Sequence, residues 1–194
     1  MKAIILSGSL RENSNTEILA ESVIKHLEKH DYDVEMVKIK EKHIEPCTAC
    51  WTCQDIFESH GCPKKDDMYE IYEGVLEADV ILFASPIYSW YCTPPLKAVM
   101  DRLVYGMNKY YGRKRGPSLW ADKVCGLITT CGYEIEAGAG VLNEGLKRYC
   151  EHSNLNYIGM CAERDMAGKE HFRRNEAMEH TRCFVERIVE AKGV

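Results

Sequence analysis

The sequence lacks several features that would assign it to common classes of protein. No apolar run approaches the roughly 18 residues that span a bilayer, and the amino terminus has no charged segment followed by an apolar stretch and a small-residue cleavage site. The formal net charge is −5, from 25 basic and 30 acidic residues, so there is no excess of positive charge for nucleic acid or an anionic membrane. We therefore expect a cytoplasmic protein without nucleic-acid or membrane partners.

Three motifs of phosphate chemistry are also missing. The spacing of the glycines fits neither the Gly-x4-Gly-Lys-Ser/Thr loop nor the three-glycine dinucleotide fingerprint. None of the ten cysteines is followed six positions later by arginine, so the Cys-x5-Arg nucleophile loop of a phosphatase is absent. These absences argue against a metal-triphosphate site and against a cysteine-dependent phosphatase.

The order of apolar patterns indicates an α/β fold. The 194 residues, 45% hydrophobic, are enough to bury the core of one globular domain, which we expect over residues 1–194. Runs rich in β-branched residues predict strands, and amphipathic patterns between them predict helices. The strands are expected at 3–6, 34–39, 80–84, 124–130 and 157–161, and the helices at 17–29, 67–77, 95–107, 136–149 and about 169–191. Such alternation predicts a parallel, doubly wound sheet with its ligand crevice beyond the carboxyl ends of the strands.

The segment between the first strand and the first helix is rich in anion-binding groups. Residues 7–16 read Ser-Gly-Ser-Leu-Arg-Glu-Asn-Ser-Asn-Thr. Hydroxyls, amides, one guanidinium and the free N–H groups of a helix start suit a phosphomonoester that stays bound, such as the tail of flavin mononucleotide (FMN). The alternative is an ordinary helix N-cap in a polar loop, because Ser, Asn and Thr are common capping residues.

Two further loops would open onto the same crevice. The third strand leads into residues 85–91, Ser-Pro-Ile-Tyr-Ser-Trp-Tyr, and the fourth into residues 130–133, Thr-Cys-Gly-Tyr. Aromatic side chains beside a phosphate pocket suit a flat, phosphorylated cofactor. The alternative role for Tyr88, Trp90 and Tyr91 is packing or a subunit contact.

Four of the ten cysteines lie together in a loop at about residues 43–66. Cys47, Cys50 and Cys53 are spaced by three, and Cys62 follows after eight further residues. Thiols at this spacing can converge on one metal centre, and four sulfurs favour a [4Fe-4S] cluster or zinc. His43 and His60 are additional candidate zinc ligands, and free or redox-sensing thiols are the remaining alternative.

Three blocks of the sequence resemble the NADPH-dependent FMN reductase and iron-sulfur flavoprotein group of the flavodoxin-like superfamily. The blocks are residues 8–16, residues 85–88 with the following Leu-Lys-x3-Asp-Arg of residues 96–102, and the cysteine loop with residues 65–68. The resemblance implies a flavodoxin-like three-layer sandwich, with a five-stranded parallel sheet in the order 2-1-3-4-5. It also implies a homodimer or homotetramer.

The resemblance further implies a noncovalent FMN whose ring carries the chemistry, so that no catalytic protein side chain is required. The residues implied to hold the phosphate are Ser9, Arg11, Ser14, Asn15 and Thr16. Those implied to hold the ring are Pro86, Ile87, Tyr88, Ser89 and Trp90 from one loop and Thr130, Cys131, Gly132 and Tyr133 from the other. A [4Fe-4S] cluster on Cys47, Cys50, Cys53 and Cys62 is favoured over zinc and over free thiols.

Three hypotheses for function follow. The first is an FMN-dependent oxidoreductase that moves electrons from NAD(P)H to a small acceptor, such as a free flavin, a quinone or a nitroaromatic. The second is an iron-sulfur flavoprotein that transfers electrons between ferredoxin and FMN, for which the basic run 109–115 is a candidate docking patch. The third is a non-enzymatic redox sensor.

Overall fold

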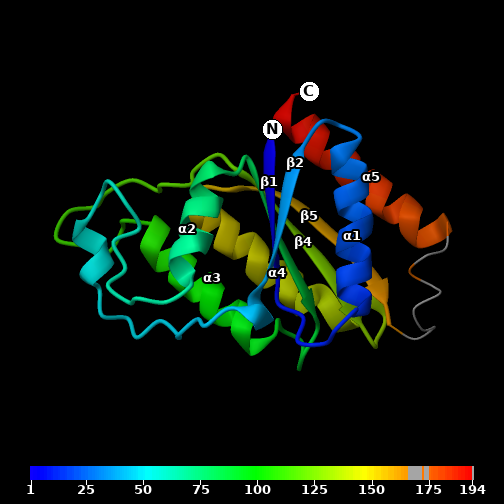
Figure 1. Cartoon of the computed structure of the whole chain (residues 1–194), viewed down its shortest axis with the longest axis horizontal. Helices are drawn as coiled ribbons and strands as arrows, with labels where there is room; N and C mark the ends of the chain where they lie inside the picture. Colours follow the sequence, from blue (N-terminus) through cyan, green and yellow to red (C-terminus); the bar gives the residue numbers. More distant parts are fainter. Residues whose placement is uncertain (166–171, 173–174, 194) are drawn as a thin grey trace.

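The computed structural model describes residues 1–165, 172 and 175–193. Five parallel strands form one sheet in the order β2-β1-β3-β4-β5, which confirms the expected fold (Figure 1). The strands are β1 (Lys2–Ser7), β2 (Asp33–Lys38), β3 (Val80–Pro86), β4 (Val124–Cys131) and β5 (Asn156–Arg164). The helices are α1 (Asn15–Glu28), α2 (Met68–Glu77), α3 (Pro94–Met107), α4 (Ile135–Ser153) and α5 (Asn175–Lys192).

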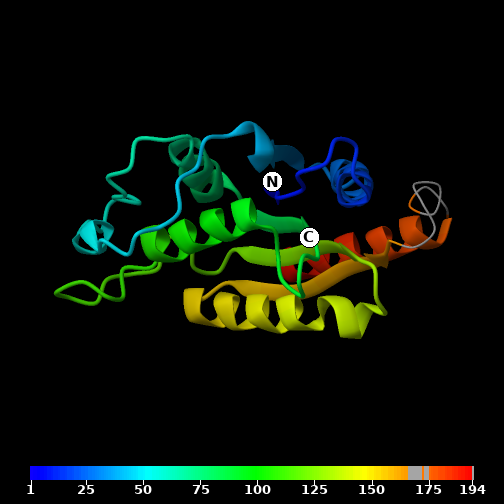
Figure 2. The ribbon, with the colours of Figure 1, turned by 90° about the horizontal axis from the view of Figure 1, so that it is seen from below.

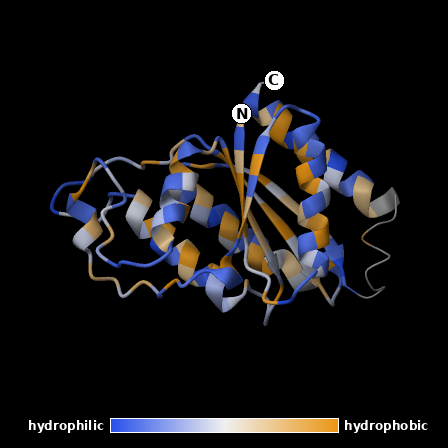
Figure 3. Ribbon diagram, viewed as in Figure 1, coloured by the Kyte–Doolittle hydropathy of each residue, from blue (hydrophilic) through white to orange (hydrophobic). Residues whose placement is uncertain are grey.

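The sheet divides the protein into two cores. Along β1, Ala3 and Ile5 pack with α1 and α5, whereas Ile4 and Leu6 pack with α2, α3 and α4. This alternation is the period of two that a strand imposes on its side chains. Figure 2 shows the helices on the two faces of the sheet, and Figure 3 shows hydrophobic residues running through its central strands.

The register of the sheet brings the ends of β1, β3 and β4 to one edge. Ser7 is paired with Ala84, and Pro86 is paired with Thr130. The backbone N–H of Gly8 then donates to the carbonyl of Ala84 at 2.8 Å. The three loops that were expected to share a crevice therefore leave the sheet side by side.

The observed elements agree with the expected ones to within a few residues at most ends. The strand β5 extends to Arg164, three residues beyond the expected end at 161. Residues 169–171, 173 and 174 of the expected last helix lie outside the described residues, and α5 begins at Asn175. None of the helices in the described ranges is both long and apolar enough to cross a membrane.

The segment between β2 and α2 contains the cysteine loop and little regular structure. Only two short 3₁₀ turns occur in it, η1 (Ile39–Glu41) and η2 (Thr52–Asp55). Figure 1 shows η2 far from the sheet, beyond α2 and α3. Two acidic residues close the base of the loop, because the backbone N–H groups of His43 and Glu45 donate to Asp67 and Asp66.

Candidate functional site

A pocket of about 310 Å³ lies where the loops after β1, β3 and β4 meet. Its volume is at the lower end of the range of typical ligand pockets. The lining residues are Ser9, Arg11, Glu12, Asn13, Ser14, Asn15, Thr16, Pro86, Ile87, Tyr88, Thr130, Cys131, Gly132 and Asp165. The structure thus brings all five residues expected at the phosphate into one pocket with six of those expected at the ring.

The first loop is held in shape by its hydroxyl groups. Ser14 is the N-cap of α1, and its hydroxyl accepts a hydrogen bond from the backbone N–H of Glu17 at 3.2 Å. The hydroxyls of Thr16 and Thr130 lie 2.7 Å apart and join the first loop to the loop after β4. Ser9 is buried, and Arg11 is exposed at the rim. The loop therefore combines a preformed backbone with an exposed cation at its edge.

These residues fit a phosphomonoester. The start of α1 presents N–H groups toward the loop, and several of the residues that line the pocket carry hydroxyl groups. Ser7, at the end of β1, is not one of the lining residues, although its buried hydroxyl has no hydrogen-bond partner among the residues that the structure describes. The N–H groups of the helix start and the hydroxyls of the lining residues are what a bound dianion would satisfy. The N-cap interpretation is also correct, because Ser14 caps the helix. The hydroxyl of Ser9 remains available to donate to a ligand.

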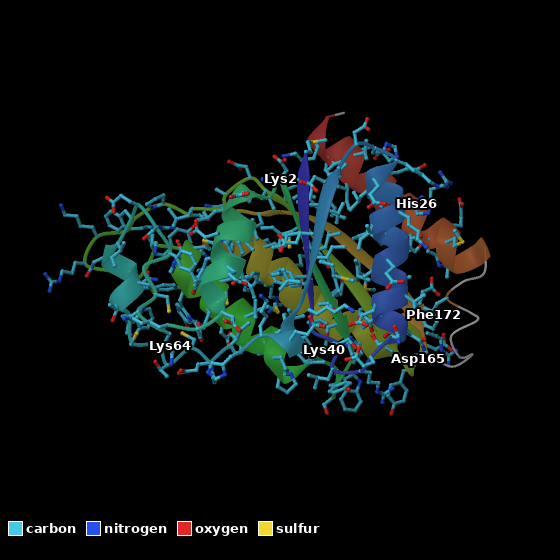
Figure 4. The ribbon with its side chains drawn as sticks, viewed as in Figure 1. Lys2, His26, Lys40, Lys64, Asp165 and Phe172 are labelled. Atoms are coloured by element: carbon cyan, nitrogen blue, oxygen red, sulfur yellow. The ribbon has the colours of Figure 1, made fainter. Side chains whose placement is uncertain are left out.

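Sequence reasoning missed Asp165. It directly follows β5, and its carboxylate accepts a hydrogen bond from the Asn15 amide at 2.5 Å. Figure 4 labels Asp165 and Lys40 along the lower edge of the view, on the side where the loop between β1 and α1 lies. The rule that ligands gather beyond the carboxyl ends of parallel strands could have found Asp165 if the fifth strand had been extended to residue 164.

Three residues expected at the flavin ring do not line the pocket: Ser89, Trp90 and Tyr133. Trp90 and Tyr133 stack on each other with ring centroids 6.2 Å apart and planes 8° apart, and they are 52% and 63% exposed. Ser89 and Trp90 both have a positive φ, at 49° and 64°, inside a tight turn closed by Tyr88 and Tyr91. Such a turn favours glycine or asparagine, so it presents Trp90 at a conformational cost.

A second cavity, of about 270 Å³, lies in the cysteine loop. Cys47, Cys50, Cys53 and Cys62 all line it, together with Arg102 from α3. In the described residues, however, no three His, Cys, Asp or Glu side chains are placed to hold one metal ion. The structure therefore brings the four thiols to one cavity but does not converge them on one point.

Three of the four sulfur atoms, those of Cys50, Cys53 and Cys62, have different surroundings. Cys53 is buried, which raises the pKa of its thiol, and its Sγ donates to the carbonyl of Tyr105 at 3.3 Å. Cys50 is exposed, and hydrogen bonds from the hydroxyl and backbone of Thr52 lower the pKa of its thiol. The sulfur of Cys62 accepts a hydrogen bond from the Arg102 guanidinium at 3.3 Å. Of the thiols of Cys50 and Cys53, that of Cys50 is therefore the more reactive in character.

Two buried cations support this loop. Arg102 forms an ion pair with Asp66, in which both side chains are almost fully buried. Lys109 donates to the carbonyls of Cys53 and His60 at 2.9 and 3.0 Å, and burial lowers its pKa. Lys109 is therefore part of the interior, and only the rest of the basic run, 110–115, reaches the surface.

The two histidines considered as zinc ligands, His43 and His60, also differ in their surroundings. His60 stacks on Tyr72, with ring centroids 4.2 Å apart. Its Nδ1 accepts a hydrogen bond from the backbone N–H of Cys62 at 3.1 Å. His43 is exposed. Neither lines the cysteine cavity, so the zinc alternative gains no ligand from them.

Comparisons with known proteins identify similar sequences and similar folds. An iron-sulfur flavoprotein of Archaeoglobus fulgidus is 36% identical over 120 residues, which are 61% of this chain and 53% of that protein. The solved structure of RosB with bound 8-demethyl-8-formylriboflavin 5′-phosphate superposes with a TM-score of 0.77 at 18% identity, and covers 98% of this chain and 78% of RosB.

A second solved structure, an NAD(P)H:quinone oxidoreductase from Methanothermobacter marburgensis, gives a TM-score of 0.69 at 18% identity, covering 95% of each chain. The chain spans about half the length of the curated relatives it matches. The family described as NADPH-dependent FMN reductase matches residues 1–159. Because this match covers most of the chain and includes every loop of the pocket except the one after β5, the chain belongs to the NADPH-dependent FMN reductase family.

Proposed function

We propose that this protein is an FMN-dependent oxidoreductase that takes electrons from NAD(P)H and passes them to a small acceptor, such as a free flavin, a quinone or a nitroaromatic. The observation that carries the proposal is the convergence of the hydroxyl-rich loop at α1 with the loops after β3 and β4 on one pocket. Membership of the family supports the choice of FMN and of a nicotinamide reductant.

In this proposal the first loop holds the phosphate. Ser9 and Thr16 donate hydroxyl hydrogen bonds, Arg11 supplies a charge-assisted one, and the start of α1 supplies backbone N–H groups. Ser14 and Asn15 complete the set, the first by capping the helix and the second by bridging to the loop after β5. None of these groups moves a proton in the reaction, and their role is to bind and orient.

The other two loops hold the ring. Pro86, Ile87 and Tyr88 form one side of the pocket, and residues 130–132 form another. FMN, when bound, supplies hydride and electron transfer. The stacked pair of Trp90 and Tyr133 extends this wall outward and would exclude water from the open side of the ring. We propose that a second copy of the chain completes this side, in a homodimer or homotetramer.

The test is a titration of the purified protein with FMN, followed by flavin fluorescence, and then an assay of NADH and NADPH oxidation with each class of acceptor. We expect one FMN per chain and acceptor-dependent oxidation of a nicotinamide cofactor. A protein that binds FMN without oxidising either nicotinamide would favour the sensor hypothesis. A protein that binds no FMN would refute the proposal.

A second candidate function is that of an iron-sulfur flavoprotein, which transfers electrons between ferredoxin and FMN. The specific observation is that four thiols line one cavity, and that they come from a loop without regular structure. Cys47, Cys50, Cys53 and Cys62 would hold a [4Fe-4S] cluster, which supplies one-electron transfer. Iron and acid-labile sulfide measured after anaerobic reconstitution test this function, and Cys50→Ser should lose both while it retains FMN. If the reconstituted protein contained no iron, the iron-sulfur function would be refuted and only the reductase function would remain.

A further inference from the structure

Glu17 is an unusual neighbour for a phosphate. It lies in the first turn of α1, next to the loop proposed to hold the FMN phosphate, and is only 2% exposed. Its Oε1 has no hydrogen-bond partner among the described residues. A buried carboxylate at this position opposes the field of the helix start, and it would repel a dianion unless a cation compensates it.

Lys40 is the cation that faces Glu17. It comes from η1, directly after β2, and its side chain is 9% exposed. Its Nζ lies 3.5 Å from Oε1 of Glu17 and 3.0 Å from Oε1 of Glu12. The same Nζ donates to the backbone carbonyl of Arg11 at 3.3 Å. One ammonium group therefore contacts the phosphate loop at two residues and α1 at a third.

The charges around the loop show what Lys40 contributes. In the part of the chain that the structure describes, Arg11 and Lys40 are cations of this loop and its contacts, and Glu12, Glu17 and Asp165 are carboxylates. Lys40 and Glu17 do not line the pocket, so both act from behind the loop. Arg11 is the one cation among the described residues that lines the pocket, and without Lys40 the buried carboxylate of Glu17 would lose the ammonium group that faces it.

We propose that Lys40 is a positioning residue for the phosphorylated flavin, which fixes the loop at Arg11 and neutralises Glu17 behind it. The inference rests on the proposed function, because it concerns how that pocket distinguishes a flavin with a phosphate from one without. It predicts that Lys40 governs the affinity for FMN much more than the affinity for riboflavin, which has the same ring and no phosphate.

The experiment measures dissociation constants for FMN and riboflavin by fluorescence in a set of variants. Lys40→Met should weaken FMN binding roughly tenfold and leave riboflavin binding within about twofold. Lys40→Arg should retain most of the FMN affinity. The matched control is Lys42→Met, because Lys42 lies on the same segment but pairs with Glu70, away from the loop. It should change neither constant.

Glu17→Gln separates the charge effect from a structural one. Alone, it should tighten FMN binding severalfold, because it removes a buried negative charge next to the phosphate loop while the charge of Lys40 remains. This variant carries the test if Lys40→Met does not fold. Combined with Lys40→Met, it should restore most of the lost affinity. The inference would be overturned if Lys40→Met weakened the binding of FMN and of riboflavin equally, or if the double variant did not recover FMN affinity. In either case, FMN binding by the unaltered protein would still support the proposed function. No FMN binding by the unaltered protein would overturn both.

Discussion

The pocket proposed for FMN and the cysteine cavity lie on one chain but are built by different means. The pocket takes residues from four loops, and each loop begins where a strand of one sheet ends. Ladder hydrogen bonds therefore fix the distances between the loops before any ligand binds. The cavity takes most of its residues from one irregular segment, which lies against α3. Its shape depends on a few side-chain contacts.

Two consecutive residues of α3 show how much those contacts differ. Asp101 pairs with Lys97 at 2.5 Å, and both side chains are about 40% exposed. Arg102 turns inward and pairs with Asp66, where both side chains are 1% exposed or less. The first pair remains in water and the second has lost its hydration. The cysteine loop thus depends on an ionic contact of the kind that is costly to break.

The largest expected effect is on this buried pair. Asp66→Asn leaves the Arg102 guanidinium buried without a countercharge, so we expect the free energy of unfolding to fall by about 3 to 5 kcal/mol. Urea denaturation monitored by Trp fluorescence measures it. Asp101→Asn is the matched control and should cost under about 1 kcal/mol. Similar losses in the two variants would mean that the cysteine loop does not depend on the buried pair.

The same pair predicts a dependence on pH. Burial opposes the ionisation of Asp66, but hydrogen bonds from Arg102 and from the Glu45 N–H outweigh it and lower the pKa of the carboxyl. A pKa that is lower in the folded state contributes stability above the unfolded value, near about 4, and loses it as pH falls through the folded value. The difference in free energy of unfolding between the unaltered protein and Asp66→Asn should therefore have its maximum value at pH 7 and shrink below about pH 4.

The next effect concerns the FMN pocket. Arg11→Ala removes a charge-assisted hydrogen bond to the proposed phosphate, so FMN binding should weaken by about 1.5 to 3 kcal/mol. Because Arg11 is exposed, the stability of the protein without flavin should not change. Titrations with FMN and thermal unfolding measure the two quantities. Unchanged retention of FMN through gel filtration would contradict the assignment of the phosphate to this loop.

The contrast between the two regions explains what the sequence could predict. The strands, the helices and the crevice at the carboxyl ends of the strands follow from alternating patterns and from the rule for the ends of parallel strands. The strand order and the individual residues proposed to bind FMN follow from the family resemblance. The partners in the cysteine loop do not follow, because no periodicity relates Asp66 to Arg102 or Lys109 to the carbonyl of His60. Lys97, Asp101 and Arg102 stand close together in one sequence block, yet the structure divides them between the surface and the interior.

A smaller effect is expected where the FMN loop passes α3. A Cβ on Gly8 would lie 2.6 Å from the Cβ of Leu96 and 2.7 Å from the hydroxyl of Thr93. Gly8→Ala should therefore cost about 1 to 3 kcal/mol of stability and weaken FMN binding by displacing the loop. In Gly132→Ala, on the other side of the pocket, the new Cβ would meet no atom within 4 Å. That control should unfold like the unaltered protein, and an equal loss in both variants would contradict the close packing at Gly8.

The smallest effect is expected for an exposed ion pair that supports neither the pocket nor the cysteine cavity. Lys97→Ala removes the surface partner of Asp101, one helical turn away on α3. Exposed pairs at this spacing contribute only about 0.3 to 0.5 kcal/mol, because water and salt screen them and ordering two side chains costs entropy. We expect a loss of that size in 50 mM salt, and less in 500 mM salt. Urea denaturation at both concentrations measures it, and a loss above about 1.5 kcal/mol that salt does not reduce would show that Lys97 supports more than Asp101.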